Sequence, residues 1–323
     1  MRARAALRSP AVLALALAGL VALPSTAAPV AAARAAGSFA AAGAAARTSA
    51  AAARQVTLTV RVHLRNAAAS GARVQLQVPL LSSGLDAYQS VGQEWLPGAG
   101  AVEEEASGAR SASYDVQVAG GSSLDLVQRY RLTLHAAGAW AGEPPSAADL
   151  AAEPGVEASD PRLLALAGRL TEGAGDEAAR AARILRYVHD ALRYDPASPA
   201  AGQGALAGWL AGSGTCTEFA RLFVALARAA GVPARIVNGE LLLDAAGRPA
   251  AGAFRSVVRH EWAEFWLPGS GWIPVDPTFS ASAGRGFAVA AYVAENRGDR
   301  PVTGSAWGGR IQASVEITVT AGW

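Results

Sequence analysis

The sequence predicts an α+β protein in which a small antiparallel β domain precedes a part built from helices and a β-hairpin. Three observations support this fold class. Residues 55–136 contain alternating apolar and polar positions, residues 160–231 have apolar residues at helical spacing, and residues 257–276 alternate again around a Pro-Gly turn. The 323 residues suffice for two domains, and the hydrophobic content of 51% excludes a chain that is disordered throughout.

We interpret residues 1–36 as a secretory signal peptide. Three arginines among the first eight residues precede an apolar run at 11–22, and small residues suited to cleavage follow it. The run is shorter than the ~20 apolar residues of a membrane-spanning helix, so we expect no integral membrane segment after cleavage. Cleavage near Ala36 would make the net charge, +2 for the whole chain, slightly negative, which argues against nucleic-acid binding. We therefore expect a secreted or periplasmic protein.

The next two segments are predicted to be a linker and a β domain. Residues 37–54 are dominated by alanine and are expected to form a flexible linker. From there Val56, Leu58 and Val60 alternate with polar residues, as in a strand with one buried face. We assign residues 55–136 to the N-terminal β domain.

The remainder of the chain is predicted to hold the catalytic part. Residues 137–159 are rich in alanine, proline and glycine and are interpreted as a second linker, which leaves residues 160–323 for one domain. The role of residues 281–323 is left open, although residues 311–320 alternate as a strand would.

Two packing helices are predicted at the start of the catalytic part. Asp160 followed by proline is typical of a helix start, and Asp176 begins a second helix that ends before Pro196. His189 lies on the second helix beside its apolar stripe. We expect His189 at the surface or behind the active residues rather than in catalysis.

The single cysteine, Cys216, lies where a nucleophile is expected. Thr215 and Glu218 have the spacing of a capping box, which makes Cys216 the first residue of a helix that ends at Gly231. Free backbone N–H groups and the positive end of the helix dipole favour a thiolate there. The alternative is a buried cysteine that only fills the base of the helix.

His260 and Asp276 lie on a predicted β-hairpin. If Leu267 pairs with Gly271 across the turn, Asp276 faces Trp262 and is a diagonal neighbour of His260 on the same face. A turn one residue longer would place the two side chains on opposite faces. Taken singly, His260 could be a core or edge histidine and Asp276 a turn residue.

Together the three residues predict a catalytic triad. Asp276 would accept the Nδ1 proton of His260 and orient the ring, and His260 would take the proton of Cys216. The backbone N–H of Cys216 is one candidate oxyanion donor, with Trp209 and Gln203 as candidates for the second.

Two further site assignments follow from the same region. Trp262 is a candidate for lining the cleft, although aromatic residues at this spacing more often pack a sheet. A metal site at His260, Glu261 and Glu264 is rejected because no second histidine has suitable spacing. We expect neither a metal nor another cofactor.

These motifs resemble those of the transglutaminase-like superfamily, in particular its exported bacterial members, over roughly residues 160–280. The resemblance rests on Gly214-Thr215-Cys216-Thr217-Glu218-Phe219-Ala220, on His260-Glu261-Trp262-Ala263-Glu264, and on Gly271-Trp272-Ile273-Pro274-Val275-Asp276-Pro277-Thr278. It implies a papain-like core with a Cys-His-Asp triad.

The resemblance leaves the activity open, because the superfamily includes transglutaminases, peptidases, amidases and inactive binding modules. Thr217 stands where the animal enzymes have tryptophan, and no acidic calcium-binding cluster is apparent, which argues against calcium-dependent crosslinking. Our leading hypothesis is an exported thiol enzyme that acts on amide bonds of proteins or peptides through an acyl-thioester on Cys216. Water or an amine would resolve the thioester, with hydrolysis slightly favoured. The alternative is a non-catalytic binding or scaffold protein with a retained core.

Overall fold

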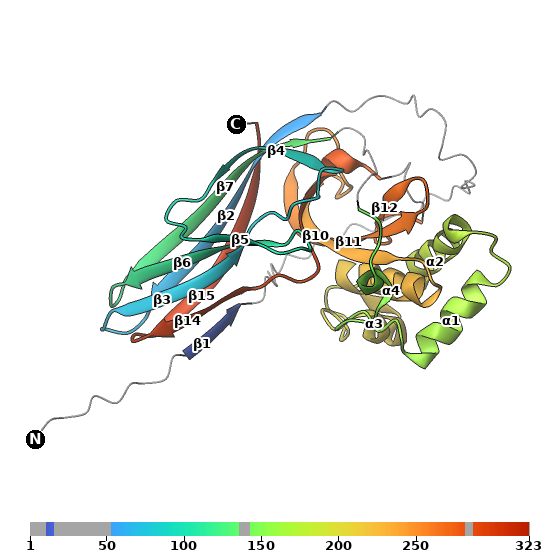
Figure 1. Cartoon of the computed structure of the whole chain (residues 1–323), viewed down its shortest axis with the longest axis horizontal. Helices are drawn as coiled ribbons and strands as arrows, with labels where there is room; N and C mark the ends of the chain where they lie inside the picture. Colours follow the sequence, from blue (N-terminus) through green and yellow to red (C-terminus); the bar gives the residue numbers. More distant parts are fainter. Residues whose placement is uncertain (1–10, 16–52, 136–142, 282–286, 323) are drawn as a thin grey trace, which may run out of the picture.

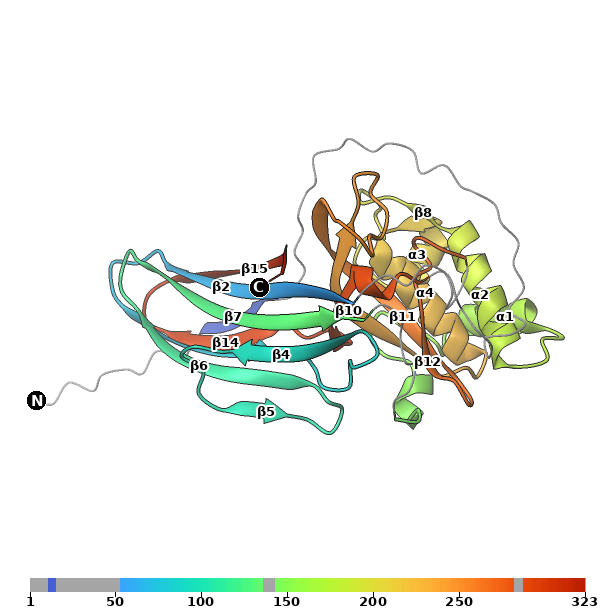
Figure 2. The same ribbon diagram turned by 90° about the horizontal axis from the view of Figure 1, so that it is seen from above.

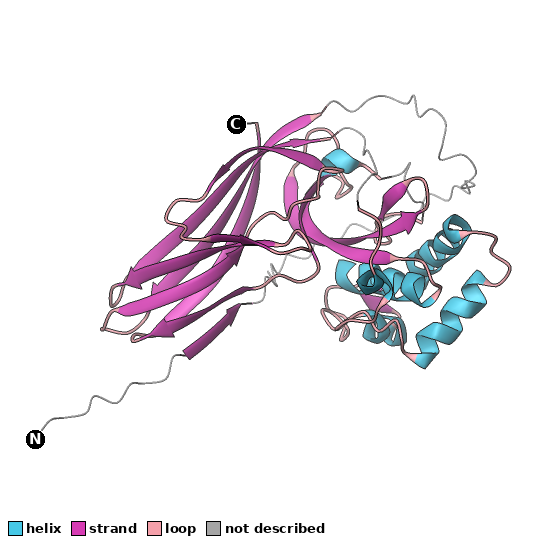
Figure 3. Ribbon diagram, viewed as in Figure 1, coloured by secondary structure: helices cyan, strands magenta, loops and turns pink. Residues whose placement is uncertain are grey.

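The computed structural model describes residues 11–15, 53–135, 143–281 and 287–322, which form a β-sandwich beside a part that combines helices and a sheet (Figures 1 and 3). Most of the predicted signal peptide and first linker lies outside the described residues. No helix within the described ranges is long and apolar enough to cross a bilayer.

The sandwich consists of two antiparallel sheets. Its strands are β1 (Ala11–Leu15), β2 (Arg54–Asn66), β3 (Ala72–Pro79), β4 (Gln89–Trp95), β5 (Val102–Glu104), β6 (Arg110–Val118), β7 (Ser123–Leu134), β14 (Val302–Trp307) and β15 (Ile311–Ala321). The strand orders are β1-β14-β3-β6-β5 and β15-β2-β7-β4. Val62 and Leu64 of one sheet share a buried cluster with Val74 and Leu76 of the other. The predicted N-terminal antiparallel β domain is therefore confirmed.

The C-terminal strands return to this sandwich. β15 pairs with β2 from Ile311 opposite Asn66 to Ala321 opposite Val56, and β14 pairs with β3. The expected strand at 311–320 is confirmed, but it does not extend the catalytic part as the range 160–323 implied. The alternation identifies a strand with one buried face without identifying its partner, which here lies at the other end of the chain.

The second part has an antiparallel sheet with helices on one face. Its elements are η1 (Ala147–Leu150), α1 (Pro161–Thr171), α2 (Glu177–Ala191), β8 (Arg193–Tyr194), α3 (Ala205–Ala211), β9 (Ser213–Gly214), α4 (Cys216–Ala229), β10 (Ala234–Leu243), β11 (Ser256–Leu267), β12 (Gly271–Val275), η2 (Val289–Ala291) and β13 (Tyr292–Arg297). The core sheet has the order β12-β11-β10-β13. Figure 2 shows α1 and α2 on the side of this sheet away from the sandwich. This arrangement confirms the α+β prediction.

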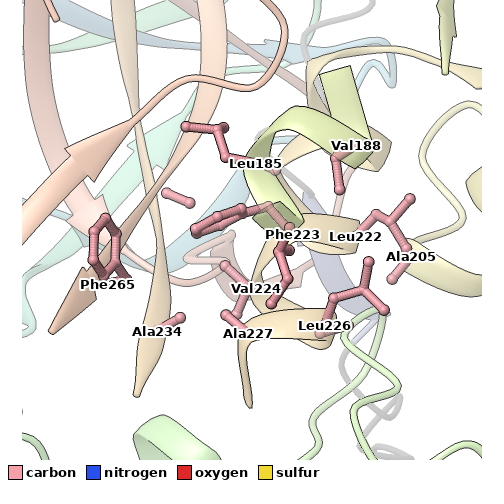
Figure 4. Close-up of a cluster of buried hydrophobic side chains, with 14 of the residues drawn as sticks. Leu185, Val188, Ala205, Leu222, Phe223, Val224, Leu226, Ala227, Ala234 and Phe265 are labelled. Atoms are coloured by element: carbon pink, nitrogen blue, oxygen red, sulfur yellow. The ribbon is translucent and has the colours of Figure 1, made fainter. Parts of the chain in front are cut away.

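Helix α4 is the centre of the core. Leu222, Phe223 and Leu226 are fully buried, and the Phe223 ring lies edge-on to Phe265 of β11 with ring centroids 6.2 Å apart. Figure 4 shows Leu185, of α2, in the same cluster. Each such side chain contributes about 1.5–3 kcal/mol on burial, so the position of α4 and of its first residue is strongly fixed.

The predicted second linker packs on the core over its described residues, 143–159. Val156 is 2% exposed and belongs to the same buried cluster as α4. Arg228 donates a hydrogen bond to the carbonyl oxygen of Ala151 at 2.7 Å and forms an ion pair with Glu153 at 2.9 Å. The small residues of this segment predicted a flexible linker, whereas the contacts with Arg228 attach the segment to α4.

Candidate active site

Cys216 lies at the N-terminus of α4, as the capping-box pattern predicts. The carboxylate of Glu218 accepts hydrogen bonds from the backbone N–H of Thr215 at 2.9 Å and from its hydroxyl group at 3.0 Å, within a reciprocal capping box. Cys216 is partly exposed. The first turn of the helix therefore holds a partly exposed Cys216 on a well-packed element.

Glu218 also connects the helix to the preceding loop, a contact that the capping pattern did not indicate. Its side chain is fully buried and accepts a hydrogen bond from the backbone N–H of Gln203 at 3.1 Å. Gly208 and Gly214 pack directly against it, and a Cβ atom on Gly214 would lie 2.5 Å from the Cβ atom of Glu218. The glycine before the Thr-Cys pair is thus required by space rather than by backbone angle.

The hairpin brings His260 and Asp276 together as predicted. Leu267 pairs with Gly271, and His260 Nε2 lies 2.7 Å from Asp276 Oδ2. The predicted ring nitrogen is wrong, because Asp276 binds Nε2 and leaves Nδ1 for Cys216. The strand register determines the face of the sheet, whereas packing around the ring determines which nitrogen faces the carboxylate.

The surroundings of His260 keep it protonated. Burial lowers its pKa, but the charges of Asp276 and Cys216, with a side-chain hydrogen bond to each, raise the pKa to about 10. For Asp276 burial raises the pKa, and the charge of His260 with hydrogen bonds from His260, Tyr292 and Thr278 lowers it overall. At neutral pH the site therefore contains an imidazolium between a carboxylate and the cysteine.

Tyr292 is a site residue that the sequence analysis missed. It lies at the start of β13, is 2% exposed, and donates its hydroxyl proton to Asp276 Oδ2 at 2.8 Å. Phe279 also contacts the site, with its ring centroid 5.7 Å from that of His260. No local motif marks Tyr292, because only the pairing of β13 with β10 brings it to the triad.

The two predicted side-chain oxyanion donors are engaged elsewhere. Trp209 donates its indole N–H to the hydroxyl oxygen of Tyr187 at 2.8 Å. Gln203 donates its amide N–H to the carbonyl oxygen of Pro199 at 2.8 Å. The short helix α3, which the sequence analysis did not anticipate, directs Trp209 toward α2. Neither assignment is supported by these contacts.

Trp262 supports His260 rather than lining an open cleft. Its side chain is fully buried, and its ring stacks with that of His260 at a centroid distance of 6.2 Å and an interplanar angle of 18°. Its indole N–H donates to the hydroxyl oxygen of Tyr88 at 3.1 Å. Its burial agrees with sheet packing, the alternative weighed for this residue, and not with a role in lining the cleft.

His189 lies behind the triad, within the range of positions expected for it. Its Nδ1 donates a hydrogen bond to the carbonyl oxygen of Pro277 at 2.9 Å. Because Pro277 follows Asp276 directly, this bond holds the turn that carries the acid.

Tyr194 is an exposed residue near Cys216. It pairs with Gly214 in the short parallel β8–β9 contact and is 53% exposed. Burial is the larger cause, and the charge of Cys216 the smaller one, of a raised pKa of Tyr194. The hydroxyl group of Tyr194 is therefore close enough to Cys216 to interact with its charge. The exposed phenol is therefore available to a molecule that approaches Cys216.

Two buried ion-pair clusters flank the core sheet. Arg221 of α4 pairs with Glu261 at 3.0 Å, beside His260, and burial raises the pKa of Glu261 to about 7. On β10 burial and the charge of Glu295 raise the pKa of Glu240 to about 8, although Arg259 contacts both carboxyl groups. Throughout the described chain, no group of three histidine, cysteine or acidic side chains is arranged to hold a metal ion.

Comparison with known proteins finds similarity over the part of the chain that contains Cys216, His260 and Asp276. Residues 164–277 match the profile of the transglutaminase-like superfamily. A protein-glutamine gamma-glutamyltransferase of Pseudomonas aeruginosa is 34% identical over 132 residues, which are 39% of this chain and 19% of that protein. An uncharacterized protein of Haemophilus influenzae is 46% identical over 76 residues, 20% of each chain. The chain thus spans about one fifth of the length of these two relatives.

One solved structure shares the fold over most of this chain. A candidate cysteine protease from Cytophaga hutchinsonii superposes with a TM-score of 0.56 at 15% identity, over 84% of this chain and 91% of that one. The periplasmic domain of TgpA from Pseudomonas aeruginosa, bound to ethylmercury, gives a TM-score of 0.40 at 23% identity, over 67% and 74% of the two chains. The first likeness covers the sandwich as well as the core, so both parts belong to a known architecture.

Proposed function

We propose that the chain is a thiol enzyme of the transglutaminase-like superfamily, whose profile residues 164–277 match, and that it acts on amide bonds of proteins or peptides through an acyl-thioester on Cys216. The observation that carries the proposal is the arrangement of Cys216, His260 and Asp276. Cys216 is partly exposed at a helix N-terminus, and the histidine and aspartate are buried and hydrogen-bonded to each other at 2.7 Å.

The first half of the reaction uses the charged form of His260. The Cys216 sulfur attacks the amide carbon, and the tetrahedral intermediate collapses as the imidazolium gives its Nδ1 proton to the leaving ammonia or amine. Asp276 remains ionised and stabilises the ring through Nε2. The backbone N–H of Cys216, in the first turn of α4, has no acceptor within the helix and is one donor for the oxyanion.

The second half regenerates the cysteine. Neutral His260 accepts a proton from water or an amine, which attacks the thioester carbon and releases an acid or a new amide. The chain contains no lysine, so a lysine acceptor in a transfer reaction belongs to another protein. The N-terminal arginines and apolar run support an extracytoplasmic site of action.

Mass spectrometry with glutamine-containing peptides tests the proposal. We expect an acyl adduct on Cys216 with loss of ammonia, followed by glutamate when water is the acceptor and by a substituted amide when an added primary amine is present. Cys216→Ala should abolish both signals, whereas His63→Gln, on the exposed face of the sandwich, should preserve them.

Two results would contradict this function. One is ammonia release by Cys216→Ala at the wild-type rate. The other is alkylation of Cys216 by iodoacetamide at pH 6 no faster in the wild type than in His260→Gln. The second result would favour a non-catalytic scaffold with a retained core.

A further inference from the structure

The sandwich covers the edge of the core sheet next to the triad. The connection between β3 and β4, residues 80–88, lies along β13, the outer strand of that sheet. Ser82 donates its backbone N–H to the carbonyl oxygen of Glu295 at 2.8 Å. The side chain of Gln89 donates to the carbonyl oxygen of Ala294 at 2.7 Å and accepts from its N–H at 3.1 Å. These bonds satisfy an otherwise open strand edge.

Tyr88 extends from this connection into the core. Its side chain is fully buried, and its hydroxyl group donates to Glu264 Oε1 at 2.7 Å while accepting the indole N–H of Trp262 at 3.1 Å. The two rings meet edge to face, with centroids 5.7 Å apart and an interplanar angle of 66°. One residue of the sandwich therefore fixes both the position and the rotation of Trp262.

The acceptor of the Tyr88 proton is itself held in place. Glu264 is fully buried and paired with Arg235 at 2.6 Å and with Arg297 at 3.4 Å. A hydrogen bond to a charged acceptor is stronger than one between neutral groups. The hydroxyl group of Tyr88 is thus anchored to an immobile charged cluster.

Trp262 passes this constraint to the triad. Its ring stacks with His260 and lies edge-on to Tyr292 at a centroid distance of 5.1 Å. Tyr292 in turn donates to Asp276. If the indole rotated, both the plane of His260 and the donor to Asp276 would lose a packing surface.

We propose that Tyr88 is a positioning residue for His260, so that the sandwich forms part of the active-site structure rather than a separable binding module. The inference rests on the proposed function, because that function requires His260 to be oriented toward Cys216. Tyr88 acts through Trp262 and touches neither substrate nor sulfur.

Tyr88→Phe tests the proposal in the full chain, because it keeps the ring and removes only the hydroxyl group. The measurement is the rate of Cys216 alkylation by iodoacetamide from pH 6 to pH 9, which requires no substrate. Loss of the hydrogen bond between Tyr88 and Trp262, which positions the imidazolium indirectly, should slow alkylation at pH 6 by on the order of fivefold. At pH 9 the difference should be small, because an ordinary thiol is largely ionised there. Partial unfolding would instead expose Cys216 and speed its alkylation at every pH.

Two further variants complete the test. Tyr114→Phe removes a phenolic hydroxyl from the sandwich interior, and we expect wild-type alkylation from it. Trp262→Phe combined with Tyr88→Phe should react at the rate of Trp262→Phe alone, because Tyr88 acts through Trp262. Wild-type alkylation in Tyr88→Phe at every pH, or additive effects of the two substitutions, would overturn the proposal.

These outcomes are separable from those of the proposed function. If the wild type forms no acyl adduct with glutamine peptides but Tyr88→Phe slows alkylation at pH 6, the proposed function fails and the positioning role stands. If the wild type is active and Tyr88→Phe alkylates like the wild type, the positioning role fails alone.

Discussion

Asp276→Asn isolates the charge that keeps His260 protonated. The asparagine side chain has the same size. Its carbonyl oxygen can still accept from the N–H of Thr278, and its NH2 group can donate to the hydroxyl oxygen of Tyr292, so the turn should be preserved. Unit charges about 4 Å apart interact by ~4 kcal/mol at an effective dielectric constant of 20. That energy corresponds to a fall of about 3 in the pKa of His260. Burial also acts to lower it, so the pKa should fall from about 10 to roughly 7 or below.

NMR titration of the imidazole nitrogens measures this change directly. The chain has four histidines, and His260→Gln assigns the resonance of interest. The matched control is Asp125→Asn, which removes the carboxylate 2.6 Å from the exposed ring of His63 and should leave His260 unchanged. A wild-type His260 that titrates near 6.5, or an Asp276→Asn variant whose His260 still titrates above pH 9, would refute the assigned ion pair.

Four further predictions follow from contacts around the triad. Glu218→Ala leaves the N–H groups of the α4 start and the preceding loop unpaired and should lower the free energy of unfolding by about 2–3 kcal/mol in urea denaturation. Gly214→Ala would force a side-chain shift and should cost about 1–3 kcal/mol in the same assay, whereas alanine at exposed Gly175, which meets no neighbour, should not. His189→Ala removes the bond to Pro277 and should cost about 1 kcal/mol, together with slower Cys216 alkylation. Because the folded pKa of Glu240 is raised from 4.5 to about 8, native Glu240 contributes stability that is lost as pH rises between these values. Between pH 4.5 and pH 9 the free energy of unfolding should fall by up to about 5 kcal/mol more in the wild type than in Glu240→Gln. An equal pH dependence in both proteins would contradict the assignment.

The parts of the site that could be predicted from sequence are those fixed by short-range geometry. The turn from Leu267 to Gly271 sets the hairpin register, and the register alone puts Asp276 on the same face as His260. The capping box likewise depends on a spacing of three residues and places Cys216 at the start of α4. In both cases the residues that define the geometry are near neighbours in the chain.

The ring rotation of His260 and the partners of Trp209 could not be predicted in this way. Each depends on side chains that arrive from other elements, namely Tyr292 from β13 and Tyr187 from α2. Periodicity shows which face of an element is buried, but it does not show which element covers that face. The same limit explains why β15 was recognised as a strand and assigned to the wrong domain.

This division between local and distant contributions bears on the extent of the functional unit. The superfamily match, residues 164–277, contains the three residues of the triad and ends before Tyr292. The donor to Asp276 and the residue that fixes Trp262, Tyr88, both lie outside it. A fragment limited to the match would leave Asp276 without one hydrogen bond and would expose Trp262, because Tyr88 and Tyr292, which pack against its ring, would be absent. The matched segment alone would therefore lack part of the packing and one of the hydrogen bonds that hold the imidazolium and its carboxylate in place.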